Sequence, residues 1–303
     1  METSFQIEKV VNELSKDRVH IDNDADKNVY APMPDINELT KAMELMVKIL
    51  FPGYFGESGI NIENLKNYIG VYIHKLSVIL QDQIERGLYF GNNGRSNLLE
   101  IKQIAKETNI AFLEKLPEIK RLLNSDITAT FNGDPAAKDK GEIIYCYPGI
   151  RALTNHRIAH ELLLLGVPLI PRVISEMAHS ATGIDIHPGA RIGESFAIDH
   201  GTGVVIGETC RIGKNVKIYQ GVTLGALSFP LDENGNPIKG IDRHPIIENN
   251  VVIYSGATIL GRITVGNGSV IGGNVWLTHD VPPNSKILQR KPKENAFMDG
   301  AGI

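Results

Sequence analysis

Residues 247–277 read IENNVVIYSGATILGRITVGNGSVIGGNVWL, and every sixth position in this stretch is aliphatic. The same six-residue period occurs in two earlier runs. Thirteen residues follow it: Ile186, Ile192 and Ile198, then Ile206, Ile212, Ile218 and Leu224, then Ile247, Ile253, Ile259, Val265, Ile271 and Leu277. Such a period fits neither an α-helix nor an alternating strand, and it is typical of a parallel β-helix built from hexapeptides. The sequence predicts this solenoid over residues 183–287, with each coil burying its aliphatic residues against its neighbours.

Small or β-branched residues often stand four positions after each aliphatic residue. The residues of this second set are Ala190, Thr202, Cys210, Val216, Val222, Val251, Ala257, Ser269 and Val275. Three hexapeptides make one triangular coil, and we expect the small residues to fill its crowded interior near the corners. An aliphatic residue is then expected to stack on its counterpart eighteen residues later.

Two interruptions break the hexapeptide register. Two extra residues lie between Ile198 and Ile206, around DHGTG at 199–203, and a longer loop at 226–242 separates Leu224 from Ile247. Insertions in a solenoid tend to collect on one face, which is often the binding face. The interruptions therefore predict where the chemistry takes place.

The first 182 residues have a helical period instead. Asp35 and Glu38 resemble a capping box before an apolar stripe that starts at Leu39. Further stripes with spacings of three and four cover residues 65–84, 101–119 and 150–165, and Gly166 and Pro168 end the last of them. The whole chain is thus predicted to be α+β, with a helical N-terminal domain (1–182) for oligomer packing, a β-helix (183–287) and a C-terminal tail (288–303).

Composition excludes several classes of function. The 303 residues carry a net charge of −4, without the basic patch of a nucleic-acid-binding protein. Cys146 and Cys210 have no metal-site spacing, which suits a reducing cytosol and two small buried side chains. The N-terminus lacks the pattern of a signal peptide, and the longest apolar segment (162–170) is too short to span a bilayer. We expect a cytoplasmic protein that binds neither membranes nor nucleic acid.

Polar residues cluster beside the two interruptions, as Asp185 with His187, Asp199 with His200, and Arg243 with His244. Asp185 and His200 are about one coil apart, so their corners are expected to be adjacent. A carboxylate beside an imidazole fixes its tautomer and stabilises its protonated form, so the pair has the properties of a general base for a hydroxyl group. The alternative is that such residues only satisfy turn amides, which we favour for His187.

A zinc site of the carbonic anhydrase type on the same fold is a rival interpretation. It requires two histidines about five residues apart and a third one or two coils earlier. His187, His200 and His244 lack that spacing, and the cationic Arg243 would repel a metal ion. We therefore predict no metal.

Four strings of the sequence resemble the serine acetyltransferase family. They are DPAA at 134–137, DIHPGARIG at 185–193, DHGTGVVIGE at 199–208 and DRHP at 242–245. The resemblance is clear over about residues 130–285 and loose over the helical region. It implies a left-handed β-helix and the transfer of acetyl from acetyl-CoA to the hydroxyl of L-serine, which gives O-acetylserine for cysteine biosynthesis.

The resemblance also assigns roles to residues. His200 is implied to deprotonate the serine hydroxyl, and Asp185 to orient His200. The groups implied to hold the ammonium and the carboxylate of serine are Asp134, Asp199, Arg243 and His244. Coenzyme A is implied to follow a groove between β-helices, with contacts near Gly225, Ala257, Gly273 and, as a candidate phosphate contact, Lys291.

Partners follow from the same resemblance. The active site is implied to lie between neighbouring β-helices of a homotrimer, and the helical domain to join two trimers into a hexamer. The chain ends MDGAGI at 298–303, and Ile303 is implied to insert into the active site of O-acetylserine sulfhydrylase. Cysteine is implied as a feedback inhibitor at the serine site.

The sequence departs from the family pattern at three places. Gly201 replaces the usual alanine, loop 226–242 is longer than typical, and LQRKPKEN at 288–295 replaces the family's Gly-Val-Pro-Ala segment. Two alternative functions stay open at this point. One is an acetyltransferase for another small hydroxyl compound such as a sugar, and the other is a non-catalytic partner of the sulfhydrylase.

Overall fold

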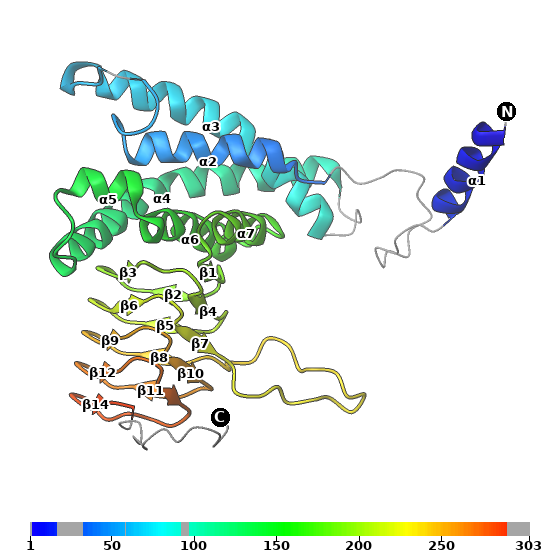
Figure 1. Cartoon of the computed structure of the whole chain (residues 1–303). Helices are drawn as coiled ribbons and strands as arrows, with labels where there is room; N and C mark the ends of the chain where they lie inside the picture. The colour runs from blue at the N-terminus through cyan, green and yellow to red at the C-terminus, as the bar shows by residue number, and fades with distance from the viewer. Residues whose placement is uncertain (1, 17–32, 58, 92–96, 290–303) are drawn as a thin grey trace.

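A computed structural model describes residues 2–16, 33–57, 59–91 and 97–289. Seven helices come first in the described chain, and all but the first lie in layers at one end of the solenoid (Figure 1). They are α1 (Glu2–Lys16), α2 (Ile36–Leu50), α3 (Ile62–Gly91), α4 (Leu98–Gly133), α5 (Lys140–Cys146), α6 (Pro148–Leu164) and α7 (Ile170–Thr182). None of the described helices is both long and apolar enough to cross a membrane.

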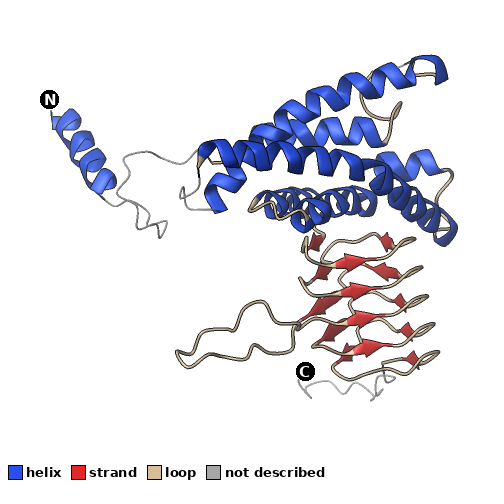
Figure 2. Ribbon diagram, turned by 180° about the vertical axis from the view of Figure 1, so that it is seen from behind, coloured by secondary structure: helices blue, strands red, loops and turns tan. Residues whose placement is uncertain are grey.

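Three parallel sheets form the faces of the solenoid, which Figure 2 shows as stacked coils. Face A contains β1 (Asp185–Ile186), β4 (Val205–Ile206), β7 (Thr223–Gly225), β10 (Thr258–Leu260) and β13 (Trp276–Leu277). Face B contains β2 (Arg191–Ile192), β5 (Arg211–Ile212), β8 (Ile246–Ile247) and β11 (Thr264–Val265). Face C contains β3 (Ala197–Asp199), β6 (Lys217–Tyr219), β9 (Val252–Ile253), β12 (Val270–Ile271) and β14 (Lys286–Ile287).

The ladder register confirms the hexapeptide prediction. Ile253 pairs with Ile271, eighteen residues later, where the repeats are uninterrupted. The spacing is twenty residues for Ile198 and Ile218, because the two extra residues lie between them. All thirteen periodic aliphatic residues point into the solenoid, and Ile192 alone among them is only partly buried.

The prediction for Thr202 is wrong. Thr202 is exposed, and Val204 is completely buried in its place. The two extra residues bulge out of the corner between faces C and A, where His200, Gly201 and Gly203 all have positive φ angles (56°, 92° and 78°). The left-handed backbone lets the chain loop outward and return to register two residues later.

The helical predictions are confirmed with corrections. Asp35 caps α2 by accepting hydrogen bonds from Asn37 N and Glu38 N, but its own amide donates to Gln83 and not to Glu38. Helix α4 extends to Gly133, well beyond the predicted stripe, and tolerates Pro117 inside it. Sequence reasoning missed α7, because Pro171 was not recognised as a helix start, although proline suits the first helical turn.

A buried ion pair joins the helices to the first coil. Arg157 of α6 and Asp126 of α4 form two parallel hydrogen bonds, of 2.7 and 2.9 Å. The same guanidinium donates to the carbonyls of Ile192 and Gly193, and the Asp126 carboxylate accepts from Phe196 N. Buried apolar residues of the helices and of the solenoid belong to one continuous cluster. The predicted boundary at 182/183 falls between α7 and β1, within this shared core.

The two cysteines differ in their surroundings. Cys210 is buried inside the solenoid as expected, and its burial raises the pKa of the thiol to about 12. Cys146 is exposed at the end of α5, so the expectation that both are buried is wrong. Both are free thiols.

Candidate active site

A first group of polar residues, which we call the His200 group, comprises Asp134, Asp199, His200 and Lys217. His200 follows β3 in the bulged corner, and its side chain is 74% exposed. Its Nε2 lies 3.9 Å from Asp199 Oδ1, while the other Asp199 oxygen accepts a salt bridge from Lys217 Nζ at 2.9 Å. The bulge thus presents an imidazole to solvent beside a carboxylate that is already paired.

Asp134 brings the end of the helical part to the same corner. It caps the C-terminus of α4, with Oδ2 accepting from the Tyr147 hydroxyl at 2.6 Å and Oδ1 from Ala136 N at 2.8 Å. The tyrosine hydrogen bond lowers the pKa of Asp134, with contributions from Lys217 and His200, and raises that of Tyr147 to about 12. Asp134 is therefore a fixed anion near the imidazole.

Sequence reasoning missed Lys217. Its ammonium donates to Gly133 O at 2.7 Å, pairs with Asp199 and lies 4.6 Å from the centre of the Tyr219 ring. These contacts connect the end of α4 to β6, on face C of the second coil. The repeat register could have indicated Lys217. It lies one coil after Ala197, and Ala197 is two residues before Asp199, so Lys217 is expected near the Asp199 corner.

A second group, which we call the Arg243 group, comprises Glu208, Arg243 and His244 and lies where face A turns into face B. Arg243 Nη2 pairs with Glu208 Oε2 at 2.7 Å, and its side chain is 22% exposed. His244 is buried, and its ring covers Gly207, where an added Cβ would lie only 2.0 Å from His244 Cδ2. Burial, together with the nearby Arg243, lowers the pKa of His244 to about 4, so its imidazole is neutral at physiological pH.

We assign Asp185 and His187 to the Arg243 group because His187 interacts electrostatically with Asp185, Glu208 and Arg243. His187 Nδ1 accepts from Gly189 N at 2.9 Å, as expected for a residue that supports a turn. Burial lowers the pKa of His187, and Arg172 adds to this effect, whereas Glu208 and Asp185 act to raise the pKa. Asp185 also shares a small cluster with Glu176 and His179, whose potential ligand atoms all lie within 4.8 Å of one another.

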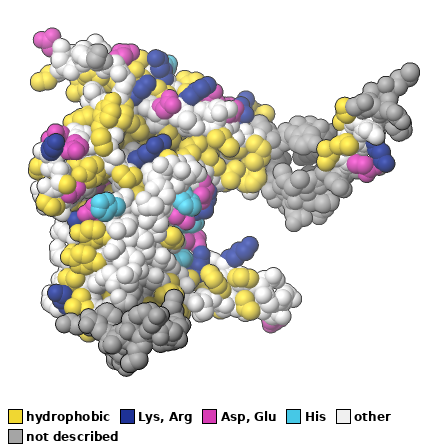
Figure 3. All heavy atoms as spheres, in the orientation of Figure 1, with side chains coloured by type: hydrophobic (Ala, Val, Ile, Leu, Met, Phe, Trp, Pro, Cys, Tyr) yellow, Lys and Arg dark blue, Asp and Glu magenta, His cyan; other side chains and the backbone are white. Residues whose placement is uncertain are grey.

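His200 and Asp185 are not in contact within the chain. Their backbones are adjacent as predicted, since Gly203 N donates to Gly183 O and β1 pairs with β4. In the described part of the chain, however, no hydrogen bond or ion pair joins their side chains, because the bulge directs His200 outward. Figure 3 shows histidine side chains at two separate places on the upper solenoid. The predicted catalytic pair is therefore divided between the two groups.

The predicted coenzyme contacts have different surroundings. Ala257 is fully buried, and its amide and carbonyl already bond Tyr254 O and Thr223 N. Gly225 ends β7 and Gly273 lies at a corner, both only partly buried. Lys291 and Ile303 lie outside the described residues.

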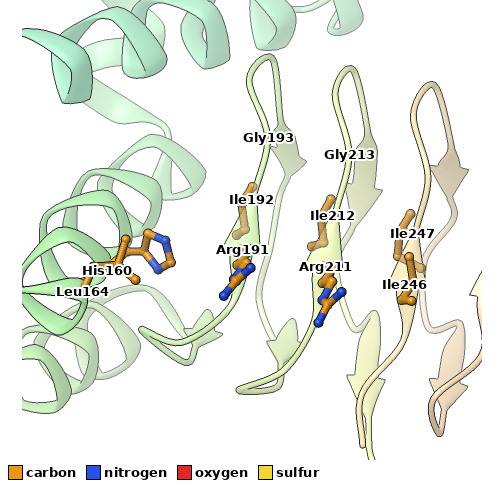
Figure 4. A pocket seen from close by; sticks show the side chains of 10 residues that line it. All are labelled: His160, Leu164, Arg191, Ile192, Gly193, Arg211, Ile212, Gly213, Ile246 and Ile247. Atoms are coloured by element: carbon orange, nitrogen blue, oxygen red, sulfur yellow. The ribbon is translucent and has the colours of Figure 1, made fainter. Parts of the chain in front are cut away.

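The two larger cavities do not coincide with either group. One is a groove of about 680 Å³ on face B, where Arg191 and Arg211 of successive coils lie in a row beside His160 of α6 (Figure 4). The other, of about 700 Å³, lies among α2, α5, α6 and α7 and includes Tyr147. None of the residues predicted for the serine site lines these two cavities. Both polar groups therefore lie outside these two cavities.

Comparisons with known proteins agree with this fold. Residues 244–279 match the family model described as bacterial transferase hexapeptide (six repeats). A serine acetyltransferase of Synechococcus elongatus, described as plasmid, is 52% identical over 278 residues, which cover 90% of this chain and 87% of the relative.

Solved structures are similar over most of the chain. Serine acetyltransferase isoform 3 of Entamoeba histolytica, in complex with cysteine, has a TM-score of 0.72 and 34% identity, covering 99% of this chain and 96% of its own. A serine acetyltransferase of Brucella abortus, in complex with coenzyme A, has a TM-score of 0.55 and 28% identity, covering 82% of this chain and 92% of its own. These similarities, together with the hexapeptide match, support the predicted architecture of this chain, a helical region followed by a left-handed β-helix.

Proposed function

The chain belongs to the serine acetyltransferase family, and from this premise we propose how its residues carry an acetyl group to the hydroxyl of L-serine. His200 takes the hydroxyl proton, and the serine oxygen attacks the carbonyl carbon of the acetyl thioester. The carbon–sulfur bond breaks, and the thiolate leaves with the proton that His200 returns. His200 suits this role because its side chain is exposed and its Nε2 lies 3.9 Å from the carboxylate of Asp199.

The two polar groups match the two charges of an amino acid. Asp134 and Asp199 are anionic partners for the ammonium, whereas Arg243 is a cationic partner for the carboxylate, with the neutral His244 beside it. The presence of anionic side chains in one group and a cationic side chain in the other is the observation that supports L-serine as the acceptor. A sugar would need neither a fixed anion nor a guanidinium.

A second copy of the chain completes the site. Within one chain the His200 group and the Arg243 group lie at different edges of the solenoid, and Asp185 belongs to the second. We propose that neighbouring β-helices of a homotrimer bring the His200 group of one copy to the Arg243 group of the next. Asp185 of that next copy then orients His200. Residues 1–182 are proposed to join two such trimers.

Acetyl-CoA is the proposed acetyl donor. The Brucella abortus relative is in complex with coenzyme A, which supports a coenzyme site in this family. We place it in the groove between copies, along the turns near Gly225 and Gly273, with Lys291 beyond the last coil. Because Ala257 is buried and its backbone is fully bonded, we expect only its neighbours in that turn to touch the coenzyme.

Cysteine is the proposed feedback ligand. The Entamoeba histolytica relative is in complex with cysteine, which has the same ammonium and carboxylate as serine. The two polar groups would therefore bind it in the same place and block the acceptor. A cytoplasmic enzyme, with two free thiols, fits this biosynthetic role.

Release of free thiol from acetyl-CoA tests the acceptor. We expect release that depends on L-serine, with homoserine, a simple sugar and buffer alone giving background rates. Release with a sugar and not with serine would contradict the roles of Asp134 and Arg243. Background rates with every acceptor would contradict the enzyme itself and favour a partner of the sulfhydrylase.

Mixed assemblies test the shared site. We expect inactive His200→Ala chains and inactive Arg243→Ala chains to regain activity when they are unfolded and refolded together, because some sites then combine two intact groups. Refolding His200→Ala with Asp134→Asn is the matched control and should regain nothing, since both changes affect the same group. Equal recovery in the two mixtures would contradict a site shared between copies.

Removal of Ile303 tests the proposed sulfhydrylase partner. We expect the shortened chain to keep its serine-dependent activity and to lose co-elution with O-acetylserine sulfhydrylase in gel filtration, because the terminal carboxylate would be displaced. Ile303→Val, which keeps a β-branched terminal residue, should retain most of the complex. A complex that persists without Ile303 would rule out this mode of binding.

A further inference from the structure

Thr209 is the hydrogen-bonding centre of the Arg243 group. It lies in the turn between β4 and β5, and residues 243–244 pass beside it on the next coil. Its hydroxyl oxygen accepts from Arg243 N at 3.0 Å and from His244 N at 3.1 Å. The same oxygen is 2.9 Å from His244 Nδ1. One side chain therefore fixes the backbone of both proposed carboxylate-binding residues and also touches the imidazole.

These contacts determine which nitrogen of His244 carries the proton. Thr209 N lies 3.1 Å from His244 Nδ1, and a backbone amide only donates, so Nδ1 is the acceptor. The hydroxyl oxygen already accepts two amide hydrogens, which leaves its own hydrogen to point at the same Nδ1. Since Nδ1 accepts, a neutral imidazole carries its hydrogen on Nε2.

Arg262 holds the same segment from the coil below. Its Nη1 donates to Thr209 O at 2.8 Å and to His244 O at 2.9 Å, and its Nη2 pairs with Asp242 at 2.7 Å. The preceding loop, residues 226–242, is largely exposed. Thr209 and Arg262 therefore restrain Arg243 and His244 where the exposed loop rejoins the solenoid.

We propose that Thr209 is a positioning residue for the acceptor: it holds Arg243 and His244 in place and fixes the His244 tautomer that presents Nε2–H to the substrate. A ring in this state donates from Nε2 and has no acceptor left for an ammonium group. His244 thus contacts an oxygen of the amino acid, namely its carboxylate or its hydroxyl. This inference rests on the acceptor site proposed above and narrows the role of His244 within it.

Thr209→Val removes the hydroxyl and keeps the shape of the side chain. We expect the KM for serine to rise about tenfold, the effect of losing hydrogen bonds worth roughly 1.4 kcal/mol. The KM for acetyl-CoA should stay within twofold, and Thr209→Ser should restore most of the serine affinity. The matched control is Thr264→Val, because Thr264 is a half-buried strand residue whose hydroxyl makes no hydrogen bond among the described residues.

The tautomer has a readout independent of activity. In protein labelled with ¹⁵N-histidine, the His244 signals, assigned with a His244→Gln variant, should show a single Nε2–H form in the native chain. Thr209→Val keeps the backbone amide that donates to Nδ1, so the Nε2–H form should remain, but the Nδ1 signal should shift because the hydroxyl hydrogen bond is lost. Unchanged signals, an unchanged KM for serine, or an equal rise in both KM values would each overturn the inference. If serine fails as acceptor for the native chain, the proposed function falls, and the ¹⁵N signals still decide whether the Thr209 hydroxyl bonds Nδ1 of His244.

Discussion

Replacement of His200 by alanine is expected to lower kcat by about 10²–10⁴-fold, the usual contribution of a positioned general base. The side chain is exposed in the bulged corner, so its loss removes no core packing. Binding of acetyl-CoA should survive, because no contact proposed for the coenzyme involves His200. Serine-dependent thiol release measures the first effect, and calorimetric titration with coenzyme A measures the second.

The matched control for this variant is His279→Ala. His279 is also an exposed histidine of the solenoid, on a later coil and outside both polar groups. We expect it to keep native turnover. Turnover of His200→Ala at the level of His279→Ala would remove His200 from the role of base and leave the proposed mechanism without its proton acceptor.

Replacement of Arg157 by methionine is expected to lower the free energy of unfolding by about 3–5 kcal/mol, which is typical when one partner of a buried ion pair is removed. Arg157 and Asp126 are 4% and 0% exposed, so the carboxylate would stay buried without its cation. The carbonyls of Ile192 and Gly193 would lose a donor as well. Chemical denaturation at fixed protein concentration measures the change.

Two further variants separate charge from packing. Arg86→Met removes a partly exposed arginine that pairs with the exposed Asp82 within α3, and it should cost less than about 1 kcal/mol. The double variant Asp126→Leu with Arg157→Met should lose less stability than Arg157→Met alone, because no unpaired charge remains. A double variant less stable than the single one would show that packing, and not the buried charge, dominates the contact between the helices and the first coil.

The β-helix was predictable because its signal is local and repeated. Ile253 and Ile271 occupy equivalent positions of identical short units, so a count of residues also gives their stacking. The helices were predictable where one apolar stripe dominates, as in α2. They were less so in α4, whose residues Ile104 and Ile110 are exposed, because the packing of neighbouring helices decides which apolar residues are covered.

The site was predictable only as a set of residue types. Motifs indicated His200, Asp134 and Arg243, but not Lys217 or Thr209, since a lysine in a strand and a threonine in a turn are common in any solenoid. Their importance comes from contacts with residues 84 and 34 positions away in the chain. A sequence pattern does not specify such contacts.

By itself the sequence determined the hexapeptide solenoid, the helical half before it and the interrupted corners where the polar residues cluster, because these follow from periods of a few residues. The tertiary structure alone decided how the polar residues are grouped. It separated His200 from Asp185 within one chain, because two inserted residues turn the first outward. It also paired Arg157 with Asp126 and placed Thr209 against Arg243 and His244, since the stacking of coils and the docking of a helix bring distant residues together.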